Sequence, residues 1–188
     1  MNLTNPIDAS HAIQQARATA TAADVLFYAV ADCDLGKVMV ARSAKGVCSI
    51  LFADSTDELV ADLANRFPQA MLVAGDAAVK DDLAKVLRYI EKPAEGLHLT
   101  LDMRGTPFQR RVWEKLKAIS AGRTVSYIEL ARWLSPLANP RAIARACAAN
   151  PIALAIPCHR VVRSDGDLAG YRWGIERKRA LIEKEATL

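Results

Sequence analysis

Three apolar runs separated by turn residues mark the first half of the chain. Residues 25–31 (VLFYAVA), 37–43 (KVMVARS) and 47–53 (VCSILFA) are rich in β-branched and other apolar side chains. The Asp34-Leu35-Gly36 and Lys45-Gly46 turns lie between them. Short runs of this kind, joined by tight turns, are typical of neighbouring antiparallel strands. The pattern predicts a small three-stranded sheet over residues 25–53.

Helical periodicity follows the predicted strands. Ser55 begins an S-x-x-E capping box for a helix that should run to about Phe67, where Pro68 ends it. A second amphipathic helix is expected from Asp76 to Glu91, before Pro93. This half therefore predicts an α/β unit centred on an antiparallel sheet.

From Thr106 onward the pattern becomes helical. Thr106 can cap a helix that has Pro107 at its first position. Spacings of three and four residues give this helix an apolar face. The predicted face consists of Phe108, Val112, Trp113, Leu116 and Ile119. Gly122 should follow the end of this helix.

Two further short helices are expected after Gly122. Ser126 begins the first (SYIELARWL), and Asn139 can cap the second (NPRAIARACAAN). Two short helices joined by a tight turn resemble a helix-turn-helix. The second is rich in alanine, and its basic residues are Arg141 and Arg145, which favours close backbone approach to DNA over base reading in the major groove. An ordinary packing helix remains an alternative.

Charge is divided unevenly along the chain. Residues 1–100 carry 9 Lys and Arg against 13 Asp and Glu, whereas residues 101–188 carry 16 against 8. Most of the excess is arginine, which suits phosphate recognition. A solvated basic face is the alternative. The 52% hydrophobic and 24% charged content is ordinary for a globular protein, and no run approaches the ~20 apolar residues of a membrane span.

The cysteines do not form a pattern typical of a disulfide framework or a zinc site. The chain has four, none in a C-x-x-C pair: Cys33, Cys48, Cys147 and Cys158. A metal site built from Cys33, Cys48, His11 and His98 is disfavoured because no useful spacing connects them. A reducing, cytoplasmic compartment is expected. The N-terminal stretch lacks the features of a secretory signal and is expected to be a poorly ordered leader over residues 1–23.

The strongest candidate for chemistry is Cys158. An apolar run (IALAI) predicts a buried strand that delivers it between Pro157 and His159, with Arg160 next. Nearby positive charge that lowered the thiol pKa from ~8.5 to ~6 would raise the thiolate fraction roughly thirtyfold. Neighbours on a strand point to opposite faces, so contact between Cys158 and His159 needs a turn or a bridging water. A buried structural cysteine beside a satisfied histidine is the alternative.

These motifs resemble a known family. Residues 105–185 are similar to the catalytic domain of O6-alkylguanine-DNA alkyltransferases, with the carboxy-terminal half of the bacterial Ada proteins as the nearest branch. The shared segments are IPCHRVV, GTPFQRRVW, TVSY, ACAANP and DGDLAGYRWG, in that order. A weaker likeness extends back to about Val25. The resemblance implies an α+β fold: an RNase H-like domain with a small antiparallel sheet, then a helical domain with a helix-turn-helix and the active-site cysteine.

The resemblance also implies the roles of a reaction centre. Cys158 would accept an alkyl group from O6 of guanine in duplex DNA, irreversibly and once per molecule. His159 would act through a water as the base, and Glu185 would orient it, with Glu183 as the nearby competitor. Asn150 would brace the turn before the active-site strand, and Tyr127 would donate toward the departing guanine.

Further residues are implied to contact the DNA and the extruded base. Arg141 would enter the duplex in place of the flipped nucleotide, with the alanine-rich helix in the minor groove. The other implied DNA contacts are Ser126, Ala142 and Arg145. The implied base pocket consists of Val161, Tyr171, Arg172 and Trp173.

The full expectation is a monomeric DNA-repair protein with no cofactor, no metal and no membrane partner. The expected divisions are a leader over 1–23, the RNase H-like domain over 24–97, a linker over 98–104 and the DNA-binding alkyltransferase domain over 105–188. Repair without a regulatory role is expected unless the chain is a fragment of a larger protein, and action on O4-alkylthymine is left open. The alternatives are a non-catalytic binder of alkylated lesions, a helix-turn-helix regulator and a cysteine hydrolase that turns over repeatedly.

Overall fold

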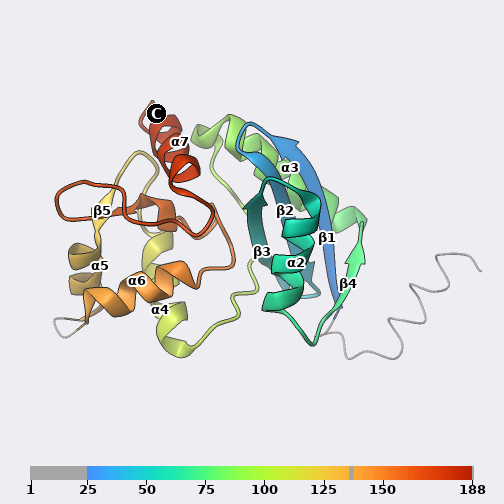
Figure 1. Cartoon of the computed structure of the whole chain (residues 1–188), viewed down its shortest axis with the longest axis horizontal. Helices are drawn as coiled ribbons and strands as arrows, with labels where there is room; N and C mark the ends of the chain where they lie inside the picture. Colours follow the sequence, from blue (N-terminus) through green and yellow to red (C-terminus); the bar gives the residue numbers. More distant parts are fainter. Residues whose placement is uncertain (1–24, 136–137, 188) are drawn as a thin grey trace, which may run out of the picture.

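The computed structural model describes residues 25–135 and 138–187, so the predicted leader lies outside the described residues. Figure 1 shows two halves side by side: a sheet with two helices, and a group of shorter helices. The C-terminal helix, α7 (Ile175–Glu185), lies at the top of the helical half, next to the end of the helix over residues 77–91. The predicted mixed α+β class is therefore confirmed.

The sheet has four strands, one more than the sequence pattern predicted. These are β1 (Val25–Cys33), β2 (Gly36–Ser43), β3 (Gly46–Ala53) and β4 (Met71–Ala74). Their order is β3-β2-β1-β4, with β1–β2 and β2–β3 antiparallel and β4 parallel to β1. The extra strand is only four residues long, too short to show a period of its own.

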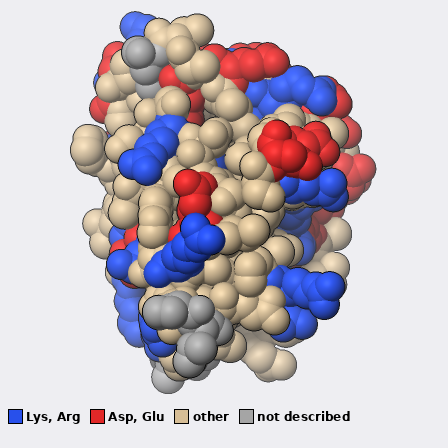
Figure 2. All heavy atoms as spheres, turned by 90° about the vertical axis from the view of Figure 1, so that its left-hand side faces the viewer, with Lys and Arg blue, Asp and Glu red and all other residues tan. Residues whose placement is uncertain are grey.

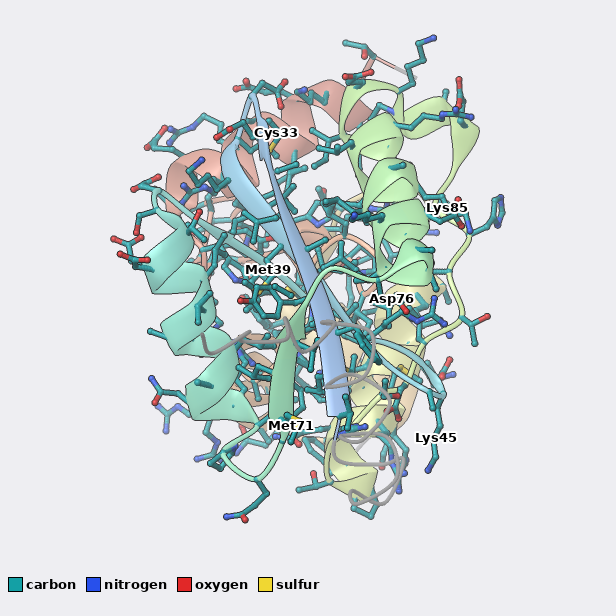
Figure 3. All side chains as sticks on the ribbon, turned by 90° about the vertical axis from the view of Figure 1, so that its right-hand side faces the viewer. Cys33, Met39, Lys45, Met71, Asp76 and Lys85 are labelled. Atoms are coloured by element: carbon teal, nitrogen blue, oxygen red, sulfur yellow. The ribbon has the colours of Figure 1, made fainter. Side chains whose placement is uncertain are left out.

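Both predicted helices of this half are present. They are α2 (Thr56–Arg66) and α3 (Ala77–Glu91), and a short 3-10 turn, η1 (Pro93–Glu95), follows α3. Ser55 caps α2 by accepting from the backbone N–H of Glu58 at 3.2 Å, but the Glu58 carboxylate bonds to the N–H of Asp54 instead of returning to Ser55. Figure 3 shows β1 running between α2 and α3, with Cys33 at one end of the strand.

The predicted linker over 98–104 is docked on the sheet. The N–H of Val47 donates to the carbonyl of Thr100, and the N–H of Asp102 donates to the carbonyl of Val47, both at 2.8 Å. Farther along β3, the N–H of Ile50 donates to the carbonyl of Pro151 at 3.0 Å. The open edge of β3 therefore binds both the connecting segment and the segment that leads to Cys158.

The second half contains the helices that the pattern predicted. They are α4 (Pro107–Lys117), α5 (Tyr127–Leu134) and α6 (Pro140–Ala148). Short strands β5 (Val125–Ser126) and β6 (Val161–Val162) pair in parallel beside them. Reciprocal capping boxes close the start of α4 and α5. The predicted apolar face of α4 is buried except for Phe108 in the first turn, which is 38% exposed.

The apolar run before Cys158 is buried but is not a strand. Residues 153–155 form turns, and only Ile152 makes a single bridge, to Ile50. Leu154 adopts a left-handed backbone conformation with φ of 65°, which a regular strand excludes. The strand prediction was wrong because an unbroken apolar run signals burial without fixing the backbone. A 3-10 turn, η2 (Cys158–Arg160), follows directly.

No helix among the described residues is long and apolar enough to span a membrane.

Candidate active site

Cys158 lies at the start of η2 and is 5% exposed. Asn150, fully buried just after α6, donates through Nδ2 to the Cys158 Sγ at 3.2 Å and to the Ile156 carbonyl at 2.8 Å. Its Oδ1 accepts from the N–H of Ile152 at 2.9 Å. One amide side chain therefore holds the turn before the cysteine and also contacts the sulfur.

The resting thiol is not ionised, which corrects the expectation from the sequence. Burial raises the pKa of the Cys158 thiol to about 11, against the lowering effects of the Asn150 hydrogen bond and the Lys178 charge. The expectation assumed that His159 and Arg160 would place positive charge beside the sulfur. Both side chains bond instead to Glu185 on α7.

His159 is completely buried and is paired with a carboxylate. Its Nε2 lies 3.0 Å from Oε1 of Glu185, at the end of α7. An ionised carboxylate can only accept, so Nε2 carries the hydrogen and Nδ1 is left as an acceptor. That Nδ1 is buried with no hydrogen-bond partner in the described protein. Burial lowers the pKa of His159, which keeps the ring neutral.

Arg160 binds the same carboxylate from the other side. Its Nε donates to Oε2 of Glu185 and its Nη2 to Oε1, both at 2.8 Å. It also donates to the carbonyl of Ile119 and, at 2.9 Å, to the hydroxyl of Tyr89 on α3. The His159 and Arg160 bonds lower the pKa of Glu185 to about 2, against its burial. Glu185 therefore stays ionised in a buried site, while Glu183 is exposed.

Lys178 is a further buried group that sequence reasoning missed. It lies on α7 with no exposed surface, and its Nζ donates to the carbonyls of Val161 at 2.6 Å and Ala169 at 3.2 Å. Burial is the main influence on Lys178 and lowers its pKa. No periodicity marks it, because its neighbours Arg177 and Arg179 are also basic.

A cavity of about 540 Å³ opens onto the cysteine. The lining comes from α5, α6, η2 and the segment before α7. It consists of Tyr127, Ala144, Cys147, Ala148, Cys158, Arg163, Ala169, Gly170, Tyr171 and Arg172. Burial raises the pKa of Tyr127 to about 12, so its hydroxyl remains a hydrogen-bond donor. The cavity thus combines a nucleophilic sulfur, a phenolic donor and small side chains that leave room for a ligand.

Two of the predicted pocket residues do not line this cavity. Val161 is fully buried, and its carbonyl is occupied by Lys178. Trp173 is 5% exposed and packs edge-on against two aromatic rings. Its ring centroid lies 6.5 Å from that of Phe52 and 5.1 Å from that of Tyr171. Trp173 packs against Tyr171, which does line the cavity, and residue spacing does not distinguish these two positions.

The predicted DNA-contacting residues lie mainly on α6. Arg141 and Arg145 are exposed, and Ala142 is half-buried between them. Ser126 differs, since it is 9% exposed and its hydroxyl caps α5 by accepting from Glu129. Figure 2 looks onto the end of the helical half, where Lys and Arg side chains are spread among uncharged residues and some Asp and Glu side chains. Among residues 25–135 and 138–187, no cluster of His, Cys, Asp and Glu could hold a metal ion.

Comparison with known sequences shows clear relatives. Residues 107–187 match the family described as the DNA-binding domain of 6-O-methylguanine DNA methyltransferase. The chain is 45% identical over 159 residues to the bifunctional transcriptional activator/DNA repair enzyme Ada of Escherichia coli, covering 85% of this chain but 45% of that protein. It is 33% identical over 150 residues to the inducible methylated-DNA–protein-cysteine methyltransferase of Bacillus subtilis, covering 78% of this chain and 82% of that protein.

Solved structures show the same fold. The crystal structure of the Mycobacterium tuberculosis O6-methylguanine methyltransferase matches with a TM-score of 0.71 at 32% identity, covering 86% of this chain and 93% of that one. A structure of that organism's protein in complex with DNA matches equally well.

Proposed function

The chain belongs to the O6-methylguanine-DNA methyltransferase family, and from that premise we propose that it repairs alkylated DNA by direct reversal. In this proposal Cys158 takes the alkyl group from O6 of guanine in duplex DNA. The observation that carries the proposal is the position of Cys158 in the cavity, where its sulfur accepts a hydrogen bond from Asn150. The next residue in the chain, His159, is paired with Glu185.

The proposed reaction is a single displacement. The sulfur forms a bond to the alkyl carbon while the bond from that carbon to O6 breaks, and the electron pair passes to guanine. The thiol proton passes through a water to His159, and the guanine, which stays in the DNA, takes up a proton from Tyr127 or from solvent in place of the lost alkyl group. Tyr127, kept protonated by burial, donates toward the guanine as negative charge develops there. The thioether product is inert, so each molecule acts once.

His159 is the proposed base, acting through a water. Its Nε2–H is fixed by Glu185, which leaves the Nδ1 lone pair free to accept a proton. The buried, unpartnered Nδ1 supports a bridging water, since buried polar atoms are normally satisfied. Because the thiol pKa is about 11, assisted proton removal is required near neutral pH.

The proposed DNA surface is α6. Its small exposed side chains permit close approach in the minor groove, and Arg141 at its start fills the space of the extruded nucleotide. Arg145 and Ala142 complete this surface, together with the start of α5, where Ser126 contributes as the helix cap and not as an exposed side chain. The flipped base enters the cavity beside Tyr171 and Arg172, and Arg172 also pairs with Asp62 of α2 at 2.6 Å.

Finer features of the fold and assembly are also proposals. The sheet order, with β4 parallel to β1, supports an RNase H-like domain over residues 24–97. The capped helices α5 and α6 support a helix-turn-helix within residues 105–188, and residues 98–104 connect the two domains. We expect a monomer acting in the cytoplasm without a cofactor.

The chain covers only part of the Ada relatives, which bears on whether a regulatory role can be proposed for it. The chain spans 45% of the length of the Ada relatives that it matches. The transcriptional activity named for the Escherichia coli protein therefore does not transfer to this chain. A non-catalytic lesion binder is disfavoured by the cysteine in the cavity, and a hydrolase is disfavoured by the family.

Stoichiometry tests the proposal. A duplex with a single O6-methylguanine is mixed with increasing amounts of protein, and the repaired fraction is measured at completion. One guanine repaired per protein molecule, with no further turnover, is expected, and Cys158→Ala should repair none. Repeated turnover, or repair by Cys158→Ala, would contradict the proposed mechanism.

A further inference from the structure

The active-site helix α7 is held by the sheet half of the molecule. Arg177 donates through Nε to the carbonyl of Leu35 at 2.7 Å, and its Nη2 pairs with Asp54. Lys184 pairs with Asp34 and donates to the carbonyl of Ile90 at 3.1 Å. Figure 1 shows α7 lying next to the β1–β2 turn and the end of α3. The position of Glu185 therefore depends on contacts made outside the helical half.

A further contact from the sheet half reaches the carboxylate that binds the proposed base. The Tyr89 hydroxyl, on α3, donates to Oε1 of Glu185 at 2.9 Å and accepts from Nη2 of Arg160 at 2.9 Å. Oε1 is the same oxygen that lies 3.0 Å from Nε2 of His159. Tyr89 is 4% exposed, Glu185 2% and His159 0%, so water cannot readily replace the hydroxyl.

Sharing one oxygen links Tyr89 to the basicity of His159. Each donor to Oε1 takes up part of the negative charge that would otherwise stabilise a protonated imidazole. Loss of the hydroxyl would leave Arg160 bonded to both carboxylate oxygens and to Ile119, so the network would survive with one donor fewer. The His159 ring would then face a carboxylate of greater effective charge.

We propose that Tyr89 is a positioning residue of the transfer reaction, supplied by the sheet half, which fixes Glu185 and sets the basicity of His159. This inference rests on the proposed function, because it assigns His159 the role of base. In this proposal the first half of the chain contributes a residue, Tyr89, to the active site.

The test is Tyr89→Phe in the full chain, with Tyr28→Phe as the matched control. Tyr28 lies on β1 in the same half and is half-buried. Tyr28→Phe therefore removes a tyrosine hydroxyl that is not part of the Glu185 network. Single-turnover rates on an O6-methylguanine duplex are measured from pH 5 to 9, together with duplex affinity and thermal unfolding. The other charged or titratable groups around His159 and Glu185 are unchanged: Cys158, Arg160, Tyr171 and Lys178.

We expect the acid limb of the Tyr89→Phe pH–rate profile to move up by roughly 0.5 to 1 pH unit, because a stronger carboxylate raises the pKa of His159. On that limb the rate should fall about threefold to tenfold, while the plateau and duplex affinity stay near the wild-type values. Tyr28→Phe should leave the limb in place. Imidazole NMR should show the same upward shift for His159, one of three histidines in the chain.

Other outcomes would overturn the inference. A lower plateau with an unmoved limb would show that Tyr89 only supports the fold, and an unchanged profile would show that it has no part in the reaction. If the wild-type protein transferred no alkyl group at all, the proposed function would fail instead, and NMR titration of His159 in the two variants would still test the coupling to Tyr89.

Discussion

Replacing the buried carboxylate of Glu185 by an amide should destabilise the protein as well as slow its reaction. Glu185 accepts from Tyr89, His159 and twice from Arg160, and it is 2% exposed. In Glu185→Gln one oxygen becomes an NH2 group, which cannot accept from the guanidinium. The Arg160 charge is then buried without its counter-ion, the kind of change that costs about 3–5 kcal/mol.

The pKa of Glu185 gives a second measure of the same loss. Its pKa falls from an ordinary 4.5 to about 2 in the folded protein. At 1.36 kcal/mol per pH unit, this difference corresponds to about 3 kcal/mol of stability at neutral pH. A depressed carboxylate pKa stabilises the fold above pH 4.5, and the effect is lost as the pH falls from 4.5 towards 2. The contribution should shrink to about 1.5 kcal/mol at pH 3.

Urea unfolding at pH 7 and pH 3 measures the stability contribution of Glu185 at each pH. Glu185→Gln should lie about 3 kcal/mol below the wild type at pH 7, with the gap roughly halved at pH 3. Glu183→Gln, at an exposed position two residues away, should change stability by less than about 0.5 kcal/mol. A gap under about 1 kcal/mol at pH 7, or a gap equal at the two pH values, would refute the reasoning.

The remaining predictions concern DNA, the leaving group and the sulfur. Arg141→Ala should slow repair of duplex DNA far more than transfer from free alkylguanine base, which needs no flipping; equal losses on both would remove Arg141 from the extrusion step. Tyr127→Phe should slow both substrates by similar factors, on the order of a hundredfold, and a loss confined to the duplex would contradict its role at the leaving group. Affinity for undamaged duplex should fall steeply with salt through counterion release, so a flat dependence in a binding titration would show that the arginines do not face phosphate. Asn150→Ala should cost roughly 1–3 kcal/mol in denaturant unfolding, because it leaves the buried N–H of Ile152 without a partner, whereas the Ile156 carbonyl still accepts from the N–H of Cys158. A loss below about 0.5 kcal/mol would show that the turn does not depend on the amide.

Most of the secondary structure could be predicted because its signals are local. Caps at Ser55, Asp76, Thr106 and Ser126 mark helix starts through side-chain bonds to the next turn. The segment before Cys158 could not be predicted, since its backbone is fixed by partners far away in the sequence, such as Ile50 on β3. The left-handed conformation of Leu154 has no signal in a run of apolar residues.

The candidate site shows the same division. The resemblance indicated Cys158, His159 and Glu185, and the structure brings His159 and Glu185 within hydrogen-bond distance. Tyr89 was missed because it is 96 residues from Glu185 and looks like an ordinary apolar-face residue of α3. The pKa of Cys158 was expected to be low because adjacent positive residues are visible in a sequence, whereas burial and the direction of a side chain are not.

The central claim is that Cys158 is the alkyl acceptor, and mass spectrometry after reaction tests it most directly. The protein is incubated with a duplex carrying one O6-methylguanine, and intact mass is followed by peptide mapping. A single gain of about 14 Da per molecule, confined to the peptide that contains Cys158, is the predicted result. The same gain on the peptide containing Cys147, or no gain while the duplex is repaired, would contradict the account.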